Sequence, residues 1–420
     1  MRHPGAPEMV HNQSGESPLQ IYVLRFVADR NCVVERQGGE QQKANSQSVT
    51  AVSSIRLHDS ASLPGKGEAQ KQSITLKGNV LKRWWRDMRW YVRGIRGEWI
   101  AVGHDGNIYC SRGSQVWMKE PDGKVLLVAG EGSPGNTGDG GPAIYAQLTS
   151  PTGLAVGPHG SLYIADLGNN NIRRVSNAGI ITTIAGTGVA GFSGDGGPAI
   201  HAELKHPMGL AIGPHGSIYV VDQGNSRVRR INPAGVISTV AGDGVSGYGG
   251  NGGPAAKAEL SSPMGVAVDS RGNIYIADWG NRRVREVSTH GIITTIAGNG
   301  YWGDYGPNGN GGPAASAELS GPRDVTVGNN GAVYIDDDWD GAIREVSPDG
   351  IISTFVHKRE LGNLSRGDIA CLPVSSAIGP HGNFYFAEEL IGVRQVYFGP
   401  EGFIREVKIA RSRSLANKEH

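Results

Sequence analysis

The chain has 420 residues and a formal net charge of +1, and charged residues make up only 19% of it. A net charge so near zero provides no general attraction to nucleic acid or to an anionic membrane, so such binding would need a local patch. Glycine is abundant, at 65 residues. It clusters between short runs of Val, Ile, Leu and Tyr without a Gly-X-Y period, which excludes collagen and indicates short strands joined by tight turns.

Residues 1–96 are predicted to form a separate, poorly defined N-terminal segment. Its start lacks the profile of a secretory signal, and no apolar run is long enough to span a bilayer. The runs 21–27 and 73–79 have the composition of strands, and the polar stretch between them is expected to be flexible. The Trp- and Arg-rich residues 81–99 are expected to pack against the repeats that follow, with a peripheral membrane anchor as the alternative.

The three cysteines, Cys32, Cys110 and Cys371, are widely spaced and are not accompanied by a CxxC pair or a His/Cys cluster. They predict neither a zinc site nor a disulfide framework. No cofactor is expected from the sequence.

Residues 97–410 are built from repeated units. GLAVGPHGSLYIADLGNNNIRRV (153–175) returns at 209–231 and 265–287, decays at 324–346, and has weaker copies at 100–118 and 376–396. A proline opens five of the units, with spacings of 56, 56, 59 and 51 residues: Pro151, Pro207, Pro263, Pro322 and Pro373. With the first copy, which lacks this proline, there are six units.

Each unit reads as four short strands, typified by LAVGP, SLYIAD, NIRRV and ITTIAG, with turn residues between them. Four antiparallel strands at this period make one propeller blade, and blades close radially because a single blade cannot bury both of its faces. The sequence therefore predicts an all-β fold, a six-bladed propeller with four-stranded antiparallel blades, followed by a C-terminal tail at 411–420.

The repeated pattern P-x-G-[LV]-A-V-x-x-x-G-x-[IL]-Y-[IV]-A-D-x-x-N-x-R-[IV]-R resembles the NHL repeat. The linker GFSGDGGPAIHAEL (191–204) resembles the NHL variety of teneurins and of bacterial YD-repeat (Rhs-like) proteins. This resemblance implies six blades and a non-catalytic binding or scaffold module. It favours an extracellular or cell-surface setting, although no signal peptide is found in this chain and no YD-repeat pattern follows the propeller.

An acid ends the second strand of four units, and an arginine follows it seven residues later. The pairs are Asp166 with Arg173, Asp222 with Arg229, Asp278 with Arg285, and Asp337 with Arg344. Because this offset spans a hairpin turn, we predict structural ion pairs between neighbouring strands. A ring of ligand-binding acids is the alternative, but the first unit has Ser111 or Arg112 at this point.

The linkers between units carry the motif G-[DN]-G-G-P-A, with its variable residue at Asp139, Asp195, Asn251 and Asn310. We predict that this residue starts a local turn and that the proline is the first residue of a short helix. Calcium requires about six to eight oxygen ligands, so one carboxylate per loop predicts no metal site.

The turn between the second and third strands contains Gly-Asn in the three central units, and we call it the GN turn. The linkers and the GN turns are predicted to share one end of the blades, and the linkers vary in length and in aromatic content. Loops on a rigid scaffold are the usual binding sites, and a protein or glycan partner is expected here. The candidate ligand-binding residues are Phe192, Tyr248, Trp279, Tyr301, Trp302 and Tyr305.

Two alternatives belong to other functional classes. The first is a metal-dependent lyase- or lactonase-like propeller enzyme, but no GxSxG, HExxH or P-loop motif is present and only His104 ends an innermost strand. The second is an RNA-binding NHL domain that uses the third-strand arginines, with Trp279 as a stacking residue. We therefore predict a protein that is not an enzyme.

Overall fold

The computed structural model describes residues 98–301, 308–357, 373–380 and 382–388, and the backbone of strands at 22–27, 31–36, 73–74, 392–398 and 404–408. The chain divides into two compact units, Met1–Asp87 and Met88–His420. No helix in the described ranges is long and apolar enough to cross a membrane.

The described part of the first unit is a three-stranded antiparallel sheet with the order β1-β2-β3. Its strands are β1 (Tyr22–Val27), β2 (Asn31–Arg36) and β3 (Ser73–Ile74). β1 and β3 fall on the two runs expected to be strands, whereas β2 was not predicted. The Trp- and Arg-rich residues 81–97 lie outside the described residues.

The second unit is a β-propeller of four-stranded antiparallel blades. Blade one comprises β4 (Trp99–Val102), β5 (Ile108–Arg112), β6 (Gln115–Lys119) and β7 (Val125–Ala129). Blade two comprises β8 (Pro151–Val156), β9 (Leu162–Asp166), β10 (Asn171–Val175) and β11 (Ile181–Ala185). Blade three comprises β12 (Pro207–Ile212), β13 (Ile218–Asp222), β14 (Arg227–Ile231) and β15 (Ile237–Ala241). Blade four comprises β16 (Val266–Val268), β17 (Ile274–Asp278), β18 (Arg283–Val287) and β19 (Ile293–Ala297). Blade five comprises β20 (Pro322–Val327), β21 (Val333–Asp337), β22 (Ala342–Val346) and β23 (Ile352–His357).

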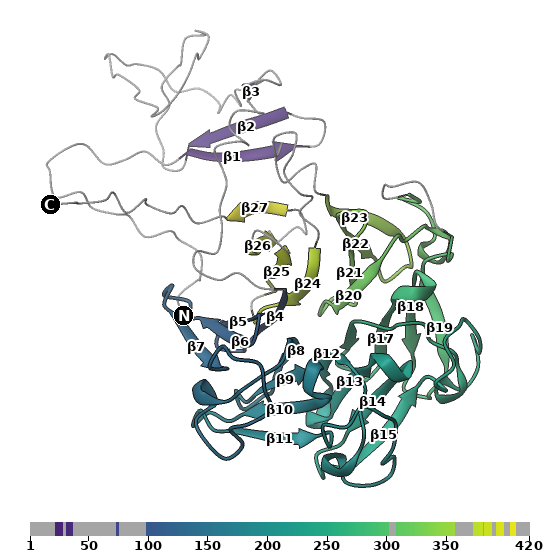
Figure 1. Cartoon of the computed structure of the whole chain (residues 1–420). Coiled ribbons are helices and arrows are strands. Elements are labelled where there is room, and N and C mark those ends of the chain that lie inside the picture. The colour runs from purple at the N-terminus through teal and green to yellow at the C-terminus, as the bar shows by residue number, and fades with distance from the viewer. Residues whose placement is uncertain are drawn as a thin grey trace, which may run out of the picture. The chain divides into compact units, whose positions relative to one another are not determined.

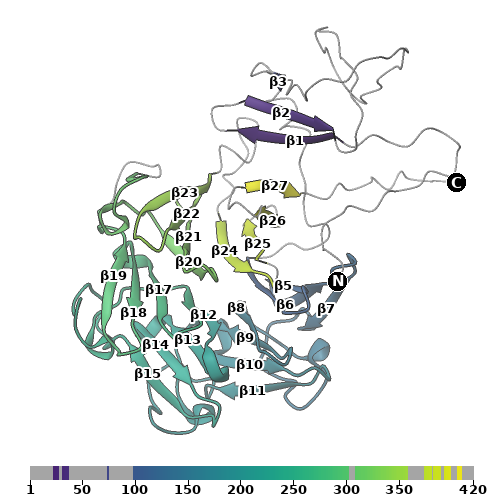
Figure 2. The same ribbon diagram turned by 180° about the vertical axis from the view of Figure 1, so that it is seen from behind.

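In every blade the first strand is innermost and the fourth is outermost, so that β8 and β12 lie near the centre and β11 and β15 at the edge (Figures 1 and 2). The structure describes five blades in full, whereas the repeats predicted six. The last repeat contributes a further sheet of β24 (Pro373–Ile378), β25 (Phe384–Glu388), β26 (Gly392–Phe398) and β27 (Ile404–Lys408), of which the outer two strands are described by backbone only. Its first strand, β24, contacts both β20 and β4.

The core lies between the blades because each blade buries both of its faces. On β9, Leu162 and Ile164 pack toward blade one, whereas Ala165 packs in the layer shared with blade three. Alternate residues of a strand point to opposite faces, so a blade held between two neighbours needs apolar residues on both. This explains why the SLYIAD-like runs are almost continuously hydrophobic.

The linkers connect consecutive blades by hydrogen bonds at both of their ends. In the first linker, Gly130 N–H donates to the Ala143 carbonyl, and Ala143 N–H donates to the Gly179 carbonyl in the outer turn of blade two. Each of the four linkers between blades one and five contains a three-residue 3-10 helix: η1 (Ala143–Tyr145), η3 (Ala199–His201), η6 (Ala255–Lys257) and η8 (Ala314–Ser316). The proline precedes this helix as its N-cap, so the prediction that it is the first helical residue was wrong by one position.

Candidate functional site

The acids that end the second strand of blades two to four lie beside the arginines of the third strand. Oδ2 of the carboxylate and Nη1 of the guanidinium are 3.7 Å apart for Asp166 and Arg173, and 3.3 Å apart for Asp222 and Arg229. The same atoms of Asp278 and Arg285 are also 3.3 Å apart, and all six side chains are buried. These groups therefore belong to the blade interior rather than to a surface that a ligand reaches.

Each of these acids also organises the turn that follows it. Asp222 accepts hydrogen bonds from the Lys205 backbone at 2.7 Å and from Asn225 Nδ2 at 2.8 Å. The Asn225 amide also donates to the Gly191 carbonyl of the preceding linker, at 2.7 Å. The GN turn and the start of the linker are thus bonded together at one end of the blade.

Burial raises the pKa of Asp166 and of Asp278 to about 6, against the opposing effect of hydrogen bonds from Asn169 and Asn281 and of the arginine charges. Removal of a carboxylate from water disfavours its charged form even where a cation is adjacent. Each buried acid therefore depends on its full set of donors.

A second acid reaches two of the arginines from the linker, and this contact was not predicted. Asp139 lies 2.7 Å from Arg173, and Asp195 lies 2.7 Å from Arg229. From the sequence, both acids are predicted only to start local turns. A signal was available, because each acid stands 34 residues before its arginine.

Blade five carries a different arrangement. Arg344 donates to the carbonyls of Glu318 and Asn308 and to Asn310 Oδ1, whereas Asp337 accepts from the backbone N–H groups of Ser320 and Gly321. Asp337 and Arg344 interact only at longer range.

Aromatic residues of two linkers lie against third-strand arginines. The guanidinium carbon of Arg227 is 3.7 Å from the ring centroid of Phe192, and that of Arg283 is 3.8 Å from the ring centroid of Tyr248. Both rings remain 41% exposed. Cation–π contacts of this kind hold the rings in place while leaving part of each ring open to solvent.

More exposed apolar side chains lie in the same linkers. Val189 is 59% exposed, Val245 is 56% exposed and Tyr301 is 73% exposed. These three residues occupy equivalent positions, three residues beyond the glycine that opens each linker loop in GTGV, GDGV and GNGY. We name the surface formed by Val189, Phe192, Val245, Tyr248 and Tyr301 the linker face.

The remaining candidate ligand-binding residues are placed differently. Trp279 is half-buried and packs edge-to-face on Trp339, with 5.6 Å between ring centroids. Trp302 and Tyr305 lie outside the described residues.

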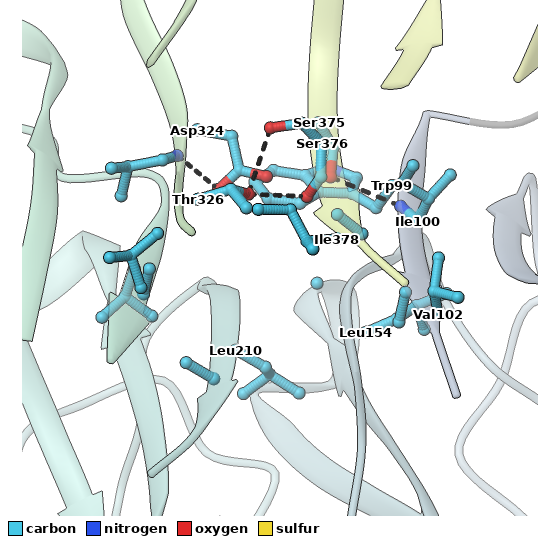
Figure 3. Close-up of a pocket in the computed structure, with 18 of the residues that line it drawn as sticks. Trp99, Ile100, Val102, Leu154, Leu210, Asp324, Thr326, Ser375, Ser376 and Ile378 are labelled. Atoms are coloured by element: carbon cyan, nitrogen blue, oxygen red, sulfur yellow. Dashed lines mark hydrogen bonds between the residues drawn. The ribbon is translucent and has the colours of Figure 1, made fainter. Parts of the chain in front are cut away.

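The inner strands surround a cavity of about 260 Å³ on the propeller axis. Most of its lining residues have apolar side chains, although the surface that they leave accessible is mainly polar. Leu154 and Leu210 lie on one side, and Asp324, Ser375 and Ser376 lie on the other (Figure 3). Within the described residues, no group of three or more His, Cys, Asp or Glu side chains is arranged to hold a metal ion.

The fold and these contacts define a class: an NHL-type β-propeller in which blades two to four each hold a buried acid–arginine pair, and in which glycine-rich linkers join the blades. The family model of the teneurin NHL domain matches residues 108–191, 189–247, 244–307 and 301–378. The chain belongs to this family, which confirms the resemblance found in its repeats.

Similar proteins include Teneurin-1 of Mus musculus, which is 32% identical over 266 residues, covering 56% of this chain and 9% of that protein. The chain therefore matches only a small part of the teneurins. Protein SUPPRESSOR OF QUENCHING 1, chloroplastic, of Arabidopsis thaliana is 27% identical over 183 residues, which cover 41% of this chain and 17% of that protein. Among solved structures, an auxiliary nutrient binding protein from Bacteroides thetaiotaomicron matches with a TM-score of 0.50 and 12% identity. The match covers 71% of this chain and 68% of that one, and it shows similarity of fold alone.

Proposed function

We propose that this propeller is a non-catalytic binding module and that its linker face binds another protein. The observation that carries the proposal is the row of exposed apolar side chains at equivalent positions of three consecutive linkers, Val189, Val245 and Tyr301. Scattered apolar residues are ordinary on a protein surface, but a periodic row beside two exposed aromatic rings is typical of an interaction site.

The fixed positions of the two aromatic rings beside the row support the same function. Phe192 and Tyr248 are held by arginines, and the Tyr248 hydroxyl is 2.9 Å from Thr295 Oγ1 in the outermost strand of blade four. Side chains that are fixed before binding lose little conformational entropy on association. Exposed Val, Phe and Tyr side chains favour a protein surface over a glycan, because a glycan would need more hydrogen-bonding groups around the rings.

The proposal includes two finer points. The ring has six blades, with β24–β27 as the sixth, since β24 contacts both β20 and β4. The chain works in an extracellular or cell-surface setting, as part of a teneurin- or YD-repeat-like assembly. Membership of the teneurin NHL family supports this setting.

The test uses photo-crosslinking from the linker face in the source cells. A photoreactive residue at Val189 or Val245 should give a discrete protein adduct, whereas one at Ile292 should not. Ile292 is 37% exposed and stands just before β19, at the other end of that strand from the Tyr301 loop. It pairs with Pro254 at the far end of the linker rather than with the linker face, so it is a control of similar character.

The partner identified from the adduct is then titrated with purified chain. The triple variant Val189→Ser, Val245→Ser, Tyr301→Ser should weaken binding by about tenfold or more, because it removes exposed apolar contacts at the centre of the interface. Unchanged affinity, equal crosslinking from Ile292, or recovery of glycan alone would overturn the proposal. Stoichiometric zinc or calcium in the purified chain would instead favour the enzyme alternative.

A further inference from the structure

Blade five carries two acids at facing positions where the other blades have small or apolar residues. Asp324 on β20 stands where blades two to four have Gly153, Gly209 and Gly265. Asp336 on β21 stands where they have Ala165, Val221 and Ala277. The equivalent positions of blades two to four are uncharged, so a blade of this kind forms without acids at these two positions.

The two acids are direct partners in the antiparallel pairing of β20 with β21. Asp324 is 7% exposed and Asp336 is fully buried. Asp324 Oδ1 accepts a hydrogen bond from the Val325 backbone at 2.9 Å and lies directly over Gly265 of blade four, where any side chain would collide with it. Neither oxygen of Asp336 has a well-formed hydrogen bond to a described residue, although Ser376 is near enough to favour the charged form.

The acid pair faces the sheet of β24–β27 across an interface that we name the blade-five seam. At its inner end Ser375 and Ser376 lie beside Asp324, and the Thr326 hydroxyl donates to the Ser376 carbonyl at 2.9 Å (Figure 3). Farther out the seam is aromatic, with the rings of Tyr334 and Phe384 4.9 Å apart between centroids. The seam thus joins an apolar outer layer to a polar inner layer that no other described blade interface has in this form.

The charges around the pair leave it short of positive partners. Its charged neighbours are Arg323 and Asp338, which bind each other at 3.4 Å, so the arginine is shared. The packed strands β16 and β24 bring Gly265 and serines to the pair, and no charged side chain.

Burial raises the pKa of Asp324 to about 7, and burial together with the charge of Asp324 raises the pKa of Asp336 well above its usual range. Two adjacent buried carboxyls titrate as a pair, because the charge of one opposes the ionisation of the other.

We propose that the blade-five seam is a pH-sensitive interface in the propeller ring. It is stable while the acid pair holds a proton and is weakened when both carboxyls are charged. With a proton present, one of the two charges is absent, and so is the repulsion between the carboxyls. Without it, two like charges face each other in a dry interface with one shared arginine.

The raised pKa values of Asp324 and Asp336 determine how the stability of the seam changes with pH. A carboxyl whose pKa is higher in the folded chain than in the unfolded chain contributes its full stability below the unfolded value, near 4, and loses it as the pH rises through the folded value. The seam should therefore be tightest in mildly acidic solution and weakest at mildly alkaline pH.

The first test is the variant Asp336→Asn, which keeps the shape of the side chain without its charge. Its thermal midpoint should match that of the unmodified chain at pH 5 and exceed it by about 5 °C at pH 8. Other acids also titrate in this range, so the quantity to follow is the difference between the two proteins at each pH. The exposed control Asp349→Asn, in a turn of the same blade, should give a constant difference.

The second test locates the effect. Hydrogen exchange of the β24 amides, corrected for intrinsic base catalysis, should accelerate between pH 6 and 8 on the order of tenfold more than that of the β12 amides. If Asp336→Asn folds poorly, Asp336→Ala restores the residue of blades two and four. A pH-independent difference, or equal acceleration of β24 and β12, would overturn the proposal.

Discussion

Replacement of Asn251 by Asp should stabilise blade four, because it supplies a partner that blade three already has. In blade three the Asp195 carboxylate lies 2.7 Å from Nη2 and 3.1 Å from Nε of Arg229. In blade four the equivalent residue is Asn251, and both Nε and Nη2 of the buried Arg285 lack a hydrogen-bond partner. Asn251→Asp would place a charged acceptor beside this guanidinium.

The gain can be estimated from blade three. A charge-assisted hydrogen bond contributes about 1.5–3 kcal/mol, and solvent screening lowers this figure where one partner is partly exposed. The Asp195 side chain is 38% exposed, so the upper part of that range does not apply. We expect a gain of about 1 kcal/mol, or about 2 °C in the thermal midpoint.

The existing contacts of the site should survive the change. Thr295 Oγ1 donates to Asn251 Oδ1 at 3.1 Å, as Thr239 Oγ1 donates to Asp195 Oδ2 at 2.6 Å. Aspartate offers the same acceptor oxygen, so no bond is lost in forming the new one.

Denaturant unfolding of Asn251→Asp at pH 7 and pH 3 measures the effect, and the reverse variant Asp195→Asn is measured at pH 7 alone. In the related acid Asp139, hydrogen bonds from Thr183 and the charge of Arg173 outweigh burial and lower the pKa. Stability from such a carboxylate is present above the usual value near 4 and is lost as the pH falls. A loss of stability at pH 7, or an equal gain at pH 3, would refute the reasoning.

Two further predictions concern backbone and charge. Burial and the charge of Asp340 raise the pKa of Asp337 to about 8. The variant Asp340→Asn restores the residue found at Asn281 in blade four. It should raise the thermal midpoint by about 2–4 °C at pH 7.5 and leave it unchanged at pH 4. A gain that persists at pH 4 would contradict this reasoning. Gly242→Ala should cost about 2 kcal/mol or more in urea unfolding, because φ is +90° and a Cβ would meet the carbonyl of the preceding turn. Gly235→Ala, at φ +78° with open space around it, should cost only about 1 kcal/mol; equal losses would show that the collision does not matter.

The repeat made much of the fold predictable. A period of 56 residues with four strand-like runs leaves few arrangements other than blades, and the seven-residue offset between Asp222 and Arg229 follows from hairpin geometry. β2 of the first unit was missed because its run, NCVVER, is short and has polar ends.

The candidate site was less predictable, since it depends on contacts across the linkers. The position of Phe192 in a variable loop indicated exposure, but no local pattern showed that Arg227 would lie against its ring. The acid pair of blade five was visible in the sequence as departures from the repeat at Asp324 and Asp336. Only the strand pairing shows that these two residues face each other.

The linker contacts also bear on how such a chain can grow during evolution. Asp195 precedes Arg229 by 34 residues, and the Asn225 amide meets Gly191 at the same separation, so a blade receives these partners from the linker before it. A duplicated segment that runs from the start of a linker to the end of its blade would carry both halves of every such contact. Gene duplication in this frame inserts a ready-made blade, whereas duplication from one inner strand to the next would separate each arginine from its acid.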